Sequence, residues 1–77
     1  MIIELNSLAD FRHYFITVDG FTEDINIKKG HNTYDGKSVL AVYNVAEHPF
    51  NVEIISNSPV RLNQFNEAMK QFEVKTI

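Results

Sequence analysis

The chain has 77 residues, of which 44% are apolar, a formal net charge of −3 and no cysteine. This length predicts a single domain over residues 1–77, and the absence of cysteine excludes disulfides and thiolate zinc sites. No apolar run is long enough to span a membrane, no leader pattern is visible, and no extended basic stretch favours nucleic acid. We therefore expect a soluble cytoplasmic protein without a cofactor.

The first two predicted elements are a strand and a capped helix. Residues 1–6 are short and β-branched, which favours a strand. Ser7 and Asp10 have capping-box spacing, so each side chain is expected to accept the other residue's backbone amide. Gly20 is expected to end the helix in a left-handed conformation. The apolar positions at helical spacing between these ends are Leu8, Phe11, Tyr14, Phe15 and Val18.

A hairpin is predicted next. Ile25 and Ile27 alternate with polar residues, as in a strand with one buried face. Gly30 and His31 form a turn signal that tolerates a positive φ at its first position. Residues 32–35 are expected to return as a second strand, which Gly36 ends.

The second half of the chain is predicted to contain two helices and one strand. Ser38 caps a helix over residues 39–46, whose Val39, Val42 and Ala46 are expected to face the sheet. Residues 50–56 follow as a strand with Val52 and Ile54 on one face. Ser58 and Pro59 begin the last helix. Its apolar stripe consists of Leu62, Phe65, Met69 and Phe72.

The predicted order is βαββαβα. Every strand has one apolar face and every helix has one apolar stripe. We therefore predict an α+β fold, in which three helices cover one face of a four-stranded antiparallel sheet.

Gly36-Lys37-Ser38, followed by an apolar run, is similar to the end of a nucleotide-binding P-loop. That loop requires a glycine five residues before Gly36, so that its backbone amides can surround phosphates. His31 occupies the position and Gly30 is one residue too far away, so no nucleotide site is predicted.

The order of elements, with "GFTEDINI" and "GKSVLAVYNV" in succession, resembles HPr, the histidine phosphocarrier of the bacterial phosphotransferase system. The resemblance implies the HPr open-faced β-sandwich. Ser38 falls on the family's regulatory phosphorylated serine. Val39, Leu40 and Tyr43 fall on the exposed patch where family members dock partners.

The family's phosphate-carrying loop is absent. HPr places a histidine, followed by arginine and proline, between its first strand and first helix. Here Ser7 lies near that position, about six residues are missing, and no His-x-Arg-Pro occurs. The resemblance thus implies an HPr-like regulatory or protein-binding module without phosphocarrier or enzyme activity, which docks a protein partner through helix 39–46.

Two alternatives stay open. One is a working phosphocarrier of the sugar phosphotransferase system with a rearranged active loop. The other is a small-ligand-binding α+β module with a concave apolar pocket. Ser38 also has two interpretations, a helix cap alone or a cap that is also phosphorylated.

The remaining polar residues predict neither a metal site nor a catalytic site. His13, His31 and His48 lack metal-ligand spacing, and we predict no metal site. Ser7, Asp10 and His13 contain the residue types of a hydrolase triad, but Ser7 is already assigned as a cap. Glu23 and its neighbour Asp24 are expected to be solvated at a strand edge.

Overall fold

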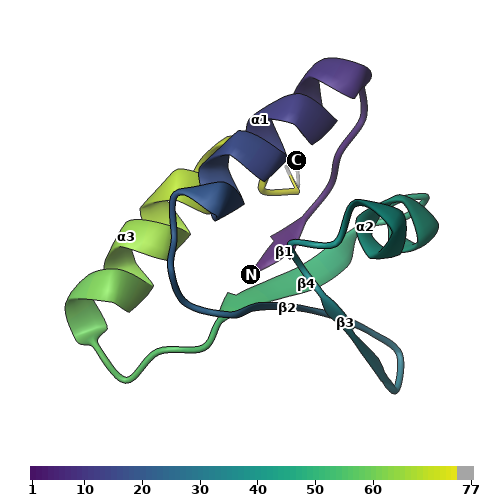
Figure 1. Ribbon diagram of the computed structural model, residues 1–77. Helices are drawn as coiled ribbons and strands as arrows, with labels where there is room; N and C mark the ends of the chain where they lie inside the picture. Colours follow the sequence, from purple (N-terminus) through teal and green to yellow (C-terminus); the bar gives the residue numbers. More distant parts are fainter. Residues whose placement is uncertain (75–77) are drawn as a thin grey trace.

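The computed structural model describes residues 1–74 and contains one sheet and three α-helices (Figure 1). The elements are β1 (Ile2–Ile3), α1 (Leu8–Asp19), β2 (Ile25–Lys29), β3 (Asn32–Asp35), α2 (Val39–Val45), β4 (Phe50–Ile54), α3 (Pro59–Met69) and a 3-10 turn η1 (Lys70–Phe72). The predicted βαββαβα order is confirmed. Within residues 1–74 the longest helix, α1, has 12 residues, so none of the helices there could span a bilayer.

The sheet is antiparallel throughout and has the order β1-β4-β2-β3. The hairpin pairs Ile27 with Tyr34, and Gly30 turns the chain with φ 62°. On its other side β2 pairs with β4, with Ile25 opposite Ile54. The outer side of β1 is covered by the chain end, because the amide of Val74 donates to the carbonyl of Ile2.

One face of the sheet carries the core. The alternating apolar residues of the strands point to this face, and the buried residues of all three helices join the same cluster. Figure 1 shows α1 and α3 on one side of the sheet and α2 near β3. The cluster contains Ile3, Leu5, Tyr14, Val18, Ile25, Ile27, Val42, Val45, Phe50, Val52, Ile54, Phe65, Met69 and Phe72. The predicted α+β class, with one buried sheet face, is confirmed.

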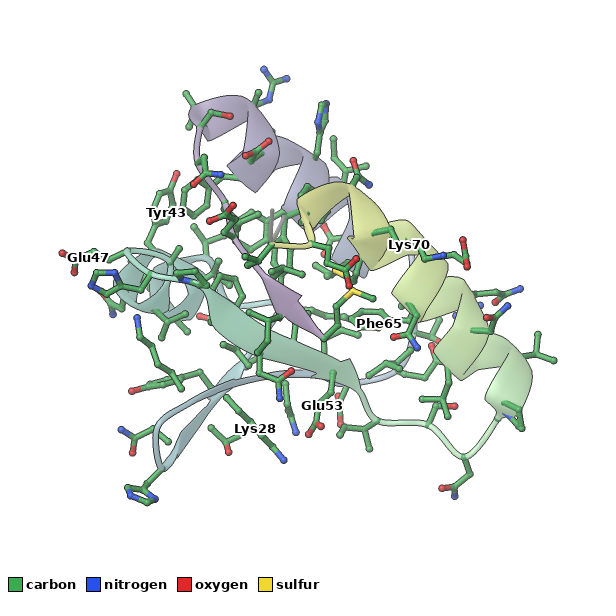
Figure 2. The ribbon with its side chains drawn as sticks, turned by 180° about the vertical axis from the view of Figure 1, so that it is seen from behind. Lys28, Tyr43, Glu47, Glu53, Phe65 and Lys70 are labelled. Carbon is green, nitrogen blue, oxygen red and sulfur yellow. The ribbon has the colours of Figure 1, made fainter. Side chains whose placement is uncertain are left out.

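The other sheet face is polar and faces solvent. Lys28 and Glu53, which lie side by side in Figure 2, form an ion pair of 3.1 Å between β2 and β4. Asn26 is paired with Glu53 and Asn51 with Lys28 across the same strands. Charged and amide side chains keep this face in water, so the hydrophobic core forms on the opposite face only.

Several expectations about helix ends and faces were wrong. Gly20 follows α1 with φ −74°, in right-handed geometry, so no left-handed stop forms. Leu8 and Leu62 are exposed, because the buried faces of their helices are formed by other residues, Tyr14 and Val18 in α1 and Phe65 and Met69 in α3. Val39 is exposed for the same reason, and Val45 is buried in its place.

Candidate functional site

Ser38 caps α2. Its Oγ accepts the amide of Ala41 at 3.3 Å, and its own amide donates to the carbonyl of Asp35 at 3.2 Å. The backbone of Ser38 is extended, as expected of an N-cap, and the residue is half-buried. The predicted cap is confirmed, and it places the hydroxyl between the end of β3 and the first turn of α2.

Hydrogen bonds fix the loop before Ser38 both to helix α1 and to strand β2 of the sheet. The hydroxyl of Tyr14, in α1, donates to the carbonyl of Gly36 at 2.7 Å. The amide of Gly36 donates to the carbonyl of Ile25, in β2, at 2.7 Å. Lys37 is bound twice, through its amide to the carboxylate of Asp35 at 2.9 Å and through Nζ to a backbone carbonyl at 2.6 Å.

Tyr14 is the buried member of this arrangement. Its side chain lies at zero exposure within the core, and burial, with a smaller effect of the negative charge of Asp35, raises the pKa of its hydroxyl above the usual range. The neutral hydroxyl therefore remains a hydrogen-bond donor to Gly36 at every physiological pH. The pair joins α1 to the Ser38 loop.

A glycine is required at position 36 because a side chain there would clash with Ile25, and not because the loop binds phosphate. A β-carbon at this position would lie 2.6 Å from Cγ2 of Ile25 and 3.0 Å from its carbonyl oxygen. Its amide, which a P-loop would turn toward a phosphate, is instead engaged by β2. The Gly-Lys-Ser sequence thus ends a hairpin strand and begins a helix.

An apolar patch lies beside Ser38. Val39, Leu40 and Tyr43 are 51%, 78% and 49% exposed. The Tyr43 ring stacks on Phe11 of α1, with centroids 4.5 Å apart and planes 16° apart, and Figure 2 shows Tyr43 on the α1 side of α2. We call these four residues the α2 patch. The exposure of Val39, Leu40 and Tyr43 agrees with the expectation from the resemblance, whereas helical spacing predicts Phe11 only for the core stripe.

The C-terminal end of α2 is also tethered. Nζ of Lys29, at the end of β2, donates to the carbonyl of Val45 at 2.9 Å. A cation at this end complements the helix dipole and satisfies a carbonyl that has no partner within the helix. With Ser38 at the other end, both termini of a helix of 7 residues are fixed.

The start of α1 holds a serine cap, and the nearest histidine lies inside the helix. Ser7 Oγ accepts the amide of Asp10 at 3.1 Å, as predicted, but the Asp10 carboxylate accepts the amide of Asn6 at 2.9 Å rather than that of Ser7. The reciprocal half of the capping box is therefore shifted by one residue. His13 is exposed within α1.

No metal centre or cavity accompanies these residues. His31 and His48 are exposed, at the β2–β3 turn and after α2. Among residues 1–74 no three histidine, aspartate or glutamate side chains gather as metal ligands, and no pocket lies between the side chains.

A second polar cluster links the loop after α1 to α3. Nε and Nη2 of Arg61 donate to the two Glu23 carboxylate oxygens at 2.7 and 2.9 Å. The guanidinium carbon lies 4.8 Å above the ring centre of Phe21, which packs edge-on against Phe65. The hydrogen bonds from Arg61 lower the pKa of the Glu23 carboxyl to about 2.

This cluster corrects the expectation that Glu23 is solvated at a strand edge. Glu23 precedes β2 and is paired with a residue 38 positions away. Both carboxylate oxygens of Glu23 accept from Arg61, so the geometry of the pair fits a structural tie.

Comparison with known proteins adds no relative. No protein-family model matches the chain, and neither a curated protein nor a solved structure is significantly similar to it.

Proposed function

We propose that the chain is an HPr-like protein-binding or regulatory module that docks a protein partner through the α2 patch and does not carry phosphate on histidine. The α2 patch is the observation that carries this proposal. It combines three exposed apolar side chains with a stacked aromatic pair, on a helix fixed at both ends. Such a preorganised apolar surface lowers the conformational entropy lost on binding.

Two further observations support the resemblance to HPr. The βαββαβα order is the one that the resemblance implies. Ser38 lies beside the α2 patch, so a phosphate on its hydroxyl would add about −1.5 to −2 charges next to Val39 and Leu40. We propose that this modification weakens docking of an apolar partner.

We base the proposal that no histidine carries phosphate on the geometry at the start of α1. Ser7 occupies the capping position, and the exposed His13 lies further along the helix, where backbone amides are used in helical hydrogen bonds. The alternative phosphocarrier needs a histidine beside free amides. The alternative ligand-binding module needs a concave pocket, and residues 1–74 supply no observation in favour of one.

A matched pair of variants tests the docking proposal. Leu40 and Val60 are each the second residue of a serine-capped helix, and they are 78% and 65% exposed. Leu40→Asp and Val60→Asp therefore add the same charge at the same helix position, on different surfaces. Immobilised wild type and both variants are compared for retention of proteins from the native host, with melting temperatures measured beside them.

The expected result is a partner that Val60→Asp retains and Leu40→Asp loses, with both variants folded. Equal retention by the two variants would contradict docking at the α2 patch. Incubation with phosphoenolpyruvate and the general phosphotransferase enzyme tests the alternative separately. An acid-labile phosphoryl group that disappears in His13→Ala would establish the phosphocarrier instead.

A further inference from the structure

The chain contains two Asp-Gly dipeptides, Asp19-Gly20 and Asp35-Gly36. In this dipeptide the glycine nitrogen can attack the aspartate side-chain carbonyl carbon. A C–N bond forms, the nitrogen loses its proton to solvent, a C–O bond breaks, and one water leaves. The resulting succinimide takes up water at its backbone carbonyl and opens to isoaspartate, so that no reactant other than water is consumed.

The fold blocks this reaction at Asp35. The nucleophile, the amide nitrogen of Gly36, donates to the carbonyl of Ile25 at 2.7 Å and belongs to a buried residue. The electrophile is also held, because the Asp35 carboxylate accepts the amide of Lys37 at 2.9 Å. Tyr14 fixes the carbonyl of Gly36 from the core. Attack therefore requires the end of the β2–β3 pair to open.

Asp19-Gly20 has none of these long-range restraints. Both residues are exposed at the C-terminal end of α1. The amide of Gly20 makes only a local bond of 3.2 Å, to the carbonyl of Thr17. Within residues 1–74, the Asp19 carboxylate has no hydrogen bond like the one that the amide of Lys37 donates to Asp35. Helix ends open with little free energy, so the nitrogen of Gly20 becomes available without disturbing the core.

We infer that Asp19-Gly20 is a site of spontaneous aspartate isomerisation in the folded protein, and that the fold protects the chemically identical pair Asp35-Gly36. Isoaspartate at position 19 places an extra methylene in the main chain just before Phe21. The Phe21 ring supports Arg61, so modification reaches the tie between this loop and α3.

The test compares the two sites within one chain. Folded full-length protein is incubated for weeks at neutral pH, in parallel with protein in concentrated guanidinium chloride. Peptides carrying each site are then assayed for isoaspartate by electron-transfer fragmentation and by methylation with an isoaspartyl methyltransferase. The unfolded sample gives the intrinsic reactivity of each dipeptide.

In the folded protein Asp19 is expected to isomerise at least about tenfold faster than Asp35, and in guanidinium the two rates should lie within about threefold. A folded-state rate at Asp35 equal to or above that at Asp19 would overturn the inference. So would the absence of isoaspartate at Asp19 in the folded sample while the unfolded sample reacts.

A variant tests the physical reason for the difference. Tyr14→Phe removes the hydrogen bond to Gly36, and the lost hydroxyl makes no hydrogen bond to either residue of the other dipeptide. It should raise the rate at Asp35 severalfold and leave the rate at Asp19 within about twofold, under conditions where circular dichroism shows the variant folded. An unchanged Asp35 rate would show that the loop restraints are not what protects this site.

Discussion

Replacing Gly36 by alanine measures how tightly the Ser38 loop is seated on β2. The new methyl carbon would lie 2.6 Å from Cγ2 of Ile25 and 3.0 Å from its carbonyl oxygen. Ordinary carbon–carbon contacts are about 3.5–4.0 Å. The oxygen cannot retreat without breaking its 2.7 Å bond to the Gly36 amide. The upper part of the overpacking range, about 2–3 kcal/mol, therefore applies.

The entropy of the unfolded chain offsets about 0.4–1 kcal/mol of this cost. The net loss of unfolding free energy is thus about 2 kcal/mol. In a domain of this size, such a loss lowers the melting temperature by roughly 8–16 °C. Guanidinium unfolding followed by far-ultraviolet circular dichroism, together with a thermal scan, measures both quantities.

The other two glycines provide controls with different physical origins. Gly30→Ala has open space around its new methyl but a φ of 62°, and should cost about 1 kcal/mol or less. Gly20→Ala has φ −74° and a nearest contact of 3.3 Å to Thr17, and should lie within about 0.5 kcal/mol of wild type. If Gly36→Ala were no more destabilising than Gly30→Ala, the steric argument would be refuted.

Three further predictions concern single hydrogen-bonded groups. Tyr14→Phe leaves the carbonyl of Gly36 unpaired and should cost about 1–3 kcal/mol in guanidinium unfolding. Because the pKa of Tyr14 is raised by burial, wild type should also lose stability as the pH rises above about 10, more steeply than the variant. Glu23 has its pKa lowered from 4.5 to about 2 by Arg61, so its contribution is present above pH 4.5 and disappears as the pH falls toward 2. The stability difference between wild type and Glu23→Gln should therefore vanish across that interval, and a constant difference would contradict the assignment. Ser38→Ala should cost about 1 kcal/mol, Ser58→Ala a similar amount, and Ser38→Asp much less, because aspartate still caps the helix. Chemical unfolding of the three variants provides the comparison, and an equal loss in Ser38→Asp would exclude a capping role.

The order of elements could be predicted because its signals are local. The caps at Ser7, Ser38 and Ser58 each bind an amide three residues ahead, so the hydrogen bond is encoded within four residues of sequence. The alternation at Ile25 and Ile27 likewise fixes which side of β2 is buried. Neither signal depends on the rest of the chain.

The faces of the shorter helices could not be predicted as well. A stripe of Val39, Val42 and Ala46 and a stripe of Val42 and Val45 differ by a small rotation in a helix of 7 residues. Only the position of α2 relative to the sheet decides between them, and this position is set by distant contacts. Helical spacing consequently predicts Val39 for the core, whereas the resemblance to HPr predicts it on the exposed patch, and it is exposed.

The long-range ties had no sequence signal at all. Arg61 and Glu23 are 38 positions apart, and Tyr14 and Gly36 are 22 apart. Tyr14 fitted the apolar stripe of α1 by spacing, but spacing does not identify the acceptor of its hydroxyl. The exposure of Leu40 could be predicted, because Leu40 falls outside the predicted stripe of Val39, Val42 and Ala46.

The exposure of the α2 patch is not explained by the stability of α2. A helix of 7 residues is too short to be stable alone, and its own attachment to the core comes from Val42 and Val45. The fold supplements this attachment with tethers at both ends, through Ser38 and Lys29. Turning Leu40 inward would have added more burial, at about 25 cal/mol per Å². The docking function that we propose for the α2 patch would use this exposed side chain.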